Sequence, residues 1–186
     1  RVPNRDTNLN RIYKVNSISR QLVSGEIDID TAYEKFQNLK ESDYPSWLKN
    51  IGLVIMCGCY AALYGATLLE MFVAGIAAIV LPLVYKLDAK LGLGMFITNL
   101  VSIIPMVIII CYLQSTIFPT IHIGIPIIGA IMPAVPGTAI TNAIRDTLRG
   151  DYNSGTARAV EAAVTALSIS IAVVIGLLIG GGVNPL

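Results

Sequence analysis

Residues 131–166, IMPAVPGTAITNAIRDTLRGDYNSGTARAVEAAVTA, decide the fold of this chain, because they break an apolar span with a Pro-Gly pair and then add charge. Pro136 lacks a backbone donor and Gly137 tolerates unusual dihedrals. We therefore expect a helix arriving from Ile121 to end there and to restart with Thr138 in its first turn. Ionisable groups beside a broken membrane span usually line a substrate or ion path. We predict that the function lies in this stretch.

The chain around this stretch has the composition of a membrane protein. Hydrophobic residues make up 54% of it, charged residues make up 13%, and its mean hydropathy is +0.69. The charges cluster before residue 50, and residues 91–144 contain no Asp, Glu, Lys or Arg. We predict two domains. Residues 1–47 are a cytosolic helical segment that we expect to be truncated at its N-terminus, and residues 48–186 are a transmembrane domain.

Apolar runs of about 20 residues, the length that crosses a bilayer as a helix, divide the second domain. The second run is short, and the fourth ends at Pro136-Gly137. The predicted spans are Leu48–Leu69, Met71–Tyr85 with an extension to Leu87, Leu91–Leu113, Ile117–Val135 and Ala157–Ile179. The predicted fold class is all-α: a polytopic membrane helix bundle of about five spans with a discontinuous fourth helix, preceded by a small helical segment.

The positions of Lys and Arg predict the topology, because short loops rich in these residues stay in the cytoplasm. With the N-terminal segment inside, the loop after the second span carries Lys86 and Lys90, and the segment after the fourth carries Arg145, Arg149 and Arg158. We predict a multi-pass protein of the inner or plasma membrane. Its N-terminal segment is cytoplasmic and its C-terminus lies outside.

Two amphipathic helices are predicted in the N-terminal segment. The first covers Thr7 to Val23, and the second begins near Thr31, because Thr31 and Glu34 have the spacing of a capping box. Three acidic residues precede this start: Glu26, Asp28 and Asp30. They fit carboxylates at a helix start better than a divalent-cation site, because the glycine and distal Glu of a calcium loop are missing.

The helix that restarts after Gly137 is amphipathic, and two functions fit it. Six polar residues lie on one side or adjacent to it: Thr138, Thr141, Asn142, Arg145, Asp146 and Arg149. If the helix start points into the protein, its free N–H groups and partial positive charge can hold a substrate carboxylate. If the helix lies flat on the inner membrane surface, Arg145 and Arg149 contact lipid phosphates. We favour the first function, because a helix that lies flat needs no Pro-Gly break.

A polar stripe follows the fifth span at intervals of three or four residues: Arg158, Glu161, Thr165 and Ser168. If the span begins near Thr156, Glu161 lies about 7 Å from its inner end. A carboxylate there is costly unless Arg158 or Arg145 pairs with it or it takes up a proton, as in proton-coupled transporters. Glu161 and Asp146 are therefore candidates for proton coupling or substrate contact, with a structural ion pair as the alternative.

Other residues of the spans carry weaker predictions. Asn99 is a candidate substrate contact, with Thr98 and Ser102 beside it, although one amide in a membrane helix often only joins helices. Glu70 and His122 are expected at the outer interface rather than in a proton relay. Close helix packing is the predicted role of four small residues: Gly58, Ala62, Gly65 and Gly75.

Several classes of function are disfavoured. The net charge of +1 and the lack of like-charge runs argue against nucleic acid as a partner. Cys57, Cys59 and Cys111 fall in predicted spans without His or carboxylate companions, so we expect no metal and no cofactor. The sequence contains no nucleophile-base pair typical of an enzyme and no repeated filter motif typical of a channel.

Three motifs resemble the N-terminal membrane half of the threonine/serine exporters, a family in the same superfamily as two-component dicarboxylate and succinate exporters. They are VNSISRQLVSGEIDIDTAYEKF (residues 15–36), the span that bears Asn99, and MPAVPGTAITNAIRDTLRGDYNSGTARAVEAAVTA (residues 132–166). The resemblance covers about residues 10–182. It implies these signature residues: Pro136, Gly137, Thr141, Asn142, Arg145, Asp146, Gly150, Asp151, Gly155, Arg158 and Glu161.

The resemblance implies a secondary transporter that exports small hydroxy amino acids, threonine and serine, at the expense of the proton gradient. A second membrane half, fused or separate, completes the pathway in this family. Five spans form a small bundle, so we expect that half or a homo-oligomer as a partner, besides membrane lipid and the small-molecule substrate. The alternatives are a dicarboxylate (succinate-type) exporter subunit and a non-transporting subunit that assembles or regulates the partner half.

Overall fold

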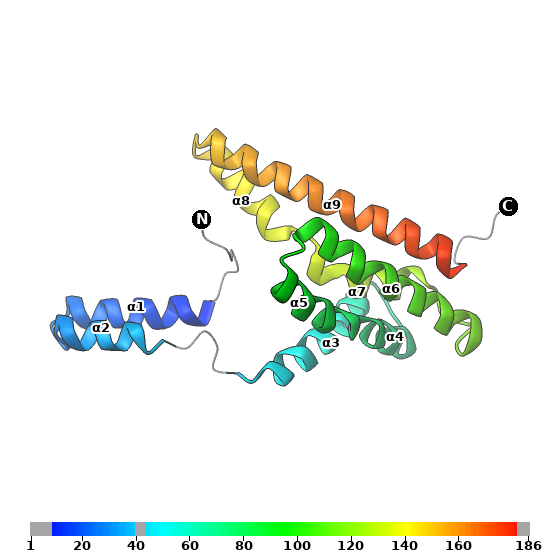
Figure 1. The fold of residues 1–186 in the computed structure, drawn as a ribbon, viewed down its shortest axis with the longest axis horizontal. Coiled ribbons are helices and arrows are strands. Elements are labelled where there is room, and N and C mark those ends of the chain that lie inside the picture. Colours follow the sequence, from blue (N-terminus) through cyan, green and yellow to red (C-terminus); the bar gives the residue numbers. More distant parts are fainter. Residues whose placement is uncertain (1–8, 40–43, 182–186) are drawn as a thin grey trace. The chain divides into compact units, whose positions relative to one another are not determined.

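The computed structural model describes residues 9–39 and 44–181, and every regular element within those ranges is a helix (Figure 1). Contacts divide the chain into two compact units, Arg1–Lys49 and Asn50–Leu186. Four helical segments of the described residues are long and apolar enough to cross a membrane, and a bent helix pair is a fifth candidate. The predicted all-helical membrane bundle with a broken fourth span is confirmed.

The N-terminal unit contains the helices α1 (Leu9–Val23) and α2 (Ile29–Gln37). The capping box predicted at Thr31 is wrong. The helix begins two residues earlier with Asp28 as its N-cap, because the Asp28 carboxylate accepts a hydrogen bond from the Thr31 amide at 3.1 Å. Hydrogen bonding from the side chain and the backbone of Thr31 lowers the pKa of the Asp28 carboxyl. The start predicted for the first helix, Thr7, lies outside the described residues.

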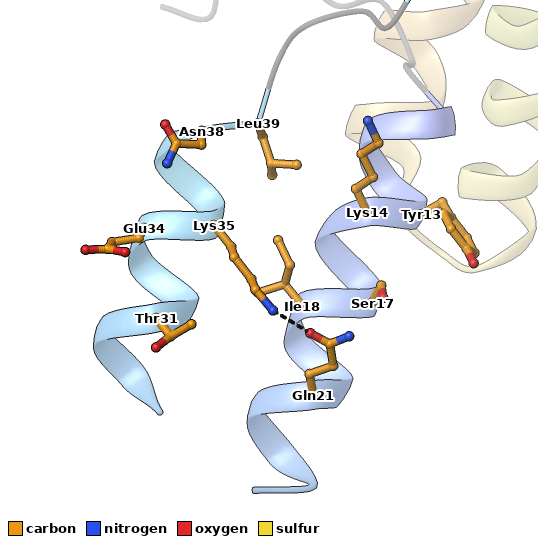
Figure 2. A pocket seen from close by; sticks show the side chains of 10 residues that line it. All are labelled: Tyr13, Lys14, Ser17, Ile18, Gln21, Thr31, Glu34, Lys35, Asn38 and Leu39. Carbon is orange, nitrogen blue, oxygen red and sulfur yellow. Dashed lines mark hydrogen bonds between the residues drawn. The ribbon is translucent and has the colours of Figure 1, made fainter. Parts of the chain in front are cut away.

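An open hollow of about 530 Å³ lies between α1 and α2 (Figure 2). Ile18 and Ala32 are the buried residues of these two helices. Across the hollow, the Lys35 ammonium donates a hydrogen bond to the Gln21 side-chain oxygen at 3.0 Å. The two helices therefore bury little apolar surface between them.

The long apolar helices overlap the predicted spans, but several ends differ. The first span ends at Leu63 rather than Leu69, the third begins at Met95 rather than Leu91, and the fourth begins at Gly124 rather than Ile117. The second span is longer than predicted, because Thr67 caps its start and Gly92, at φ +62°, ends it. The fifth begins five residues before the predicted Ala157, because Asp151 caps it there. The helices are α3 (Ser46–Leu63), α4 (Leu68–Ala78), α5 (Val80–Leu91), α6 (Met95–Thr116) and α9 (Tyr152–Gly180).

The fourth span is broken as predicted. It comprises α7 (Gly124–Ile131), the short 3₁₀ helix η1 (Met132–Ala134) and α8 (Gly137–Leu148). Its two parts, Gly124–Ala134 and Gly137–Leu148, meet at 56°. The bend falls at Val135 and Pro136, because proline cannot continue the hydrogen-bond ladder of the preceding helix.

The core of the membrane unit lies around α6. Ile103, Met106, Val107 and Ile110 of this helix are buried, and α4, α5, α7 and α9 pack around it. Gly176 of α9 allows close approach, because an added Cβ would lie 2.6 Å from the Cβ of Val107.

Two of the four small residues predicted to pack closely do so. An added Cβ at Gly58 would lie 3.0 Å from the backbone oxygen of Met71, and one at Gly75 would lie 3.5 Å from that of Val54. Ala62 is exposed, and Gly65 lies in a turn at φ +81°, so the packing prediction is wrong for both.

The helices α6 and α9 run parallel, because the contacts between them advance toward the C-terminus of both helices together. The Thr165 hydroxyl lies 3.1 Å from the sulfur of Met95, the first residue of α6, and Gly180 approaches Cys111 near the other end. With 29 residues, α9 is about 44 Å long. Its first part therefore extends beyond the start of α6, where it packs against α8 (Figure 1).

Candidate functional site

The helices α8 and α9 form an antiparallel hairpin with a tight turn. Gly150 takes φ +84° in the turn, and the Asp151 carboxylate caps α9 by accepting the Ser154 amide at 3.1 Å. Hydrogen bonding from the side chain and backbone of Ser154 lowers the pKa of Asp151. Gly155 packs directly on α8, since a Cβ there would collide with the Thr147 hydroxyl. The hairpin is thus closely packed at its base.

The start of α8 has the free backbone donors that the sequence predicts. Pro136 is the N-cap and supplies no side-chain hydrogen bond. The Gly137 amide donates to the Val135 oxygen at 2.8 Å, whereas within the described residues the amides of Thr138 and Ala139 donate no backbone hydrogen bond. Such amides and the helix dipole favour an anion at this end.

The register of the hairpin places this helix start near the beginning of α6. Asp146 lies opposite Arg158, and Thr147 lies opposite Gly155. Because both helices rise equally per residue, this register brings Gly137 about level with residues 165–167 of α9. Thr165 in that range contacts the first residue of α6. The free amides therefore lie near the end of the membrane body, rather than at its middle.

The polar residues of α8 divide between two sides. Asn142 and Asp146 are half-buried on the side that includes the buried Ala143. The others are exposed: Thr138, Thr141, Arg145 and Arg149. The Thr141 hydroxyl donates to the Gly137 oxygen at 2.9 Å. Asn142 and Asp146 thus face the hairpin partner, while the two arginines face outward.

An ion pair joins the two helices of the hairpin. The Arg158 Nε lies 3.0 Å from Asp146 Oδ2, and the two side chains are 47% and 24% exposed. Helical spacing in the sequence suggested Glu161 as the partner of Arg158. The structure shows Asp146 as a partner, because α8 packs beside α9 and brings Asp146 to Arg158.

Glu161 is half-buried and lies farther from the helix end than predicted. Because α9 begins at Tyr152, Glu161 is about 14 Å from the start of the helix, not about 7 Å. Its backbone oxygen accepts a hydrogen bond from the Thr165 hydroxyl at 2.8 Å. Glu161 therefore lies one turn before the contact of α9 with the start of α6.

Asn99 joins α6 to α9. Its amide donates to the Ser168 hydroxyl at 2.8 Å, and Ser168 donates to the Thr165 backbone oxygen at 2.7 Å. Ser102 donates at 2.7 Å to the Thr98 oxygen on its own helix. All of these residues are buried. Within the predicted polar stripe, Thr165 and Ser168 thus face α6, and Arg158 faces α8.

Comparison with known proteins agrees with the motifs at this hairpin. Residues 1–180 match the model of the family described as "Putative threonine/serine exporter". The chain belongs to the threonine/serine exporter family. A Klebsiella aerogenes protein described as a probable succinate transporter subunit is 23% identical over 159 residues, which cover 83% of this chain and 60% of that protein. The chain thus spans less than two thirds of that relative's length. No solved structure matches it.

As a member of this exporter family with several apolar helices, the chain is a multi-pass membrane protein. The hairpin α8–α9 and its Pro-Gly break carry all but one of the residues predicted for the site: Pro136, Gly137, Thr138, Thr141, Asn142, Arg145, Asp146, Arg158 and Glu161. The structure brings Asp146 and Arg158 into contact, whereas Thr138, Thr141 and Arg145 lie on the exposed side of α8. Asn99 lies apart, at Ser168, deeper in the membrane body.

The sequence did not predict the structural role of Glu70. Glu70 was expected at the outer interface, but it is only 2% exposed. Its carboxylate completes a capping box with Thr67 at the start of α4 and accepts the His122 amide at 2.9 Å. The position of Glu70 at the outer interface stays a prediction, and the structure adds that its side chain is buried and hydrogen-bonded. The Thr-x-x-Glu spacing of Thr67 and Glu70 could have indicated the cap.

Proposed function

We propose that this chain is one half of a secondary transporter that exports threonine and serine, coupled to protons, together with a second membrane half. The observation that carries the proposal is the uncapped start of α8 after the Pro-Gly break, on the same helix hairpin as an ion pair and a half-buried carboxylate. Broken helices of this kind form ion and substrate sites in many transporters. Membership of an exporter family supports the same conclusion.

In this proposal the amides at the start of α8 hold the substrate carboxylate. The Thr138 and Ala139 amides are the unpaired donors there. Thr141 and Asn142 lie one turn farther along the same helix and read the polar groups of the substrate. The hydroxyl of threonine or serine can both donate and accept, which suits a side-chain amide as its partner.

Proton coupling is assigned to Asp146 and Glu161. Deprotonated Asp146 pairs with Arg158 at 3.0 Å, and a proton on Asp146 breaks this pair. Export driven by inward proton movement requires proton and substrate to occupy the transporter in turn, so we assign the intact pair to the substrate-bound state and the protonated Asp146 to the substrate-free return. Glu161, on the same helix as Arg158 and one turn from Thr165, is the second proton-binding candidate. Alternating access then takes place around the inner ends of the fourth and fifth spans.

We place this site on the cytoplasmic side. Lys86 and Lys90 precede the start of α6, and Arg145, Arg149 and Arg158 lie on the hairpin that extends beyond that start. Basic residues gathered at one end of a membrane bundle favour the cytoplasmic face. The N-terminal unit is then cytoplasmic as well.

Neutral substitutions test the coupling. Asp146→Asn and Glu161→Gln, singly and together, should abolish acceleration of export by an imposed pH gradient while leaving the protein folded. Ser170→Ala is a control, because the Ser170 hydroxyl is exposed and donates to Ala166 of its own helix within the part of the chain that the structure describes. Unchanged proton-coupled export in the double variant, in membranes that contain the second half, would refute the assignment.

A dicarboxylate cargo is the second candidate, and the Klebsiella aerogenes relative favours it, since that protein is described as a succinate transporter subunit. Arg145 and Arg149 on the outward side of α8 offer partners for a second carboxylate. Counterflow of radiolabelled threonine in proteoliposomes distinguishes the two cargoes. Serine should compete better than succinate for a hydroxy amino acid exporter, and the reverse ranking would transfer the proposal to dicarboxylates.

A further inference from the structure

The side of α8 that faces away from α9 carries two parallel strips of different chemistry. One strip is apolar and exposed: Ile140 is 45%, Ile144 57% and Leu148 83% exposed. These residues recur every four positions, so they form a continuous ridge. The second strip runs beside it and carries the exposed side chains of Thr141, Arg145 and Arg149. An exposed helix side that is half apolar and half basic is typical of helices that lie in a lipid interface.

The two arginines of this strip differ from Arg158. Arg158 is paired with Asp146 at 3.0 Å. Among the described residues, Arg145 and Arg149 form no ion pair and no side-chain hydrogen bond. Each guanidinium therefore keeps its full set of donors for a ligand outside the described chain. A guanidinium binds phosphate with two parallel hydrogen bonds, which makes a phosphate-bearing surface a matching partner.

The position of α8 next to a membrane span selects lipid as that surface. Only Val135 and Pro136 separate α8 from the end of the apolar segment Gly124–Ala134, and the bend of 56° turns α8 away from the direction of that span. The helix α9, about 44 Å long, exceeds the roughly 30 Å of bilayer hydrocarbon, and helices of excess length commonly tilt. A tilt of the hairpin brings α8 toward the headgroups.

We propose that α8 lies in an anionic lipid interface, with Ile140, Ile144 and Leu148 among the acyl chains and Arg145 and Arg149 on lipid phosphates. The start of α8 stays free for the substrate, because its amides lie at the end of the helix and not on this side. The proposal concerns the outward side of α8, where it competes with the dicarboxylate candidate for Arg145 and Arg149 but not with the amides that hold the threonine carboxylate. The hairpin α8–α9 then requires anionic lipid to hold its position in the membrane. Lipid quenching is measured without transport, so its outcome is independent of the export assays.

Tryptophan fluorescence in nanodiscs tests the proposal. Trp47 is the only tryptophan of the chain, so Trp47→Phe removes the native signal and Leu148→Trp places one probe on the apolar strip. Nanodiscs of phosphatidylcholine with and without phosphatidylglycerol, and with brominated acyl chains, report lipid contact, while aqueous acrylamide reports water contact. In anionic nanodiscs we expect brominated lipid to quench the probe at least threefold more than acrylamide does.

Charge variants separate the headgroup contact from simple burial. Arg145→Gln with Arg149→Gln, or neutral lipid alone, should reduce bromolipid quenching at least twofold. Arg20→Gln, which removes an exposed arginine of α1, should leave it unchanged. Far-UV circular dichroism and gel filtration confirm that each variant is folded.

Four results would overturn the proposal. Quenching by acrylamide without quenching by brominated lipid would place the strip in water. Protection from both quenchers would mean that a protein surface or a second copy covers it. Bromolipid quenching that is insensitive to charge would remove the phosphate contact. Restoration by inorganic phosphate in neutral nanodiscs would identify a free anion site in place of a lipid surface.

Discussion

Replacing Gly129 by Ala tests how closely the broken span must approach its neighbour. Gly129 lies on α7, just before the break, and faces α3. An added Cβ would lie 2.6 Å from the Cβ of Ala61 and 2.8 Å from both the Ala61 nitrogen and the Cys57 oxygen. Two of these three atoms belong to the backbone, so neither can be relieved by rotating a side chain. Either α7 or α3 must move.

The expected magnitude follows from two opposing terms. Forcing a methyl group into a well-packed contact costs about 1–3 kcal/mol. Alanine is also a better helix former than glycine by about 0.5–1 kcal/mol. With both terms at the middle of their ranges, the net loss for Gly129→Ala is about 1 kcal/mol, which corresponds to a fall of about 2–4 °C in melting temperature for a chain of this size.

Gly124→Ala is the matched control. It makes the same chemical change at the first residue of the same helix, where an added Cβ meets nothing within 4 Å. Thermal unfolding of the purified chain in detergent, followed by gel filtration, should show an unchanged or slightly higher midpoint for Gly124→Ala and a lower one for Gly129→Ala. Equal midpoints for the two variants would refute the close packing of α7 on α3.

Three further outcomes are expected. Glu70→Gln keeps the shape of the side chain but replaces a buried acceptor with a donor, so it should lower the free energy of unfolding by about 1–3 kcal/mol in detergent melts; an unchanged midpoint would contradict the buried cap. Asn99→Ala should cost about 0.5–2 kcal/mol by removing a buried interhelical hydrogen bond, while Ser170→Ala should stay within about 0.5 kcal/mol; equal losses would argue against the α6–α9 link. The folded-state pKa of Asp151 is lowered, so its cap is fully formed above the ordinary Asp pKa and is lost as pH falls through the lowered value. Hydrogen exchange of the Ser154 amide should accelerate over that acidic range relative to Asp151→Asn, and parallel pH profiles for the two chains would contradict the cap.

The sequence predicts those features of the fold that depend only on residues close together in the chain. Apolar runs long enough to cross a bilayer identify the spans, and Pro136 followed by Gly137 identifies the break, because proline acts on its own helix. The amphipathic pattern of α8 likewise needs only helical spacing. None of these depends on which helix lies beside which.

The structure differs from the sequence prediction where a helix start has two possible caps, or where a contact with a distant part of the chain determines the surroundings of a side chain. Both Asp28 and Thr31 are good caps, and only the observed helix start shows that Asp28 is used. Glu70 is buried because the segment at His122, far along the chain, covers it and donates to it. The partner of Arg158 is Asp146, because α8 lies beside α9, a tertiary arrangement that spacing along α9 does not contain.

The measurement that tests the central claim most directly is threonine counterflow in proteoliposomes that hold this chain alone, the second membrane half alone, or both. Exchange that appears only with both halves, and that is lost in the Asp146→Asn, Glu161→Gln double variant, is the predicted result. Proteoliposomes with both folded halves that exchange neither threonine, serine nor succinate would contradict the account and would leave this chain as a non-transporting subunit.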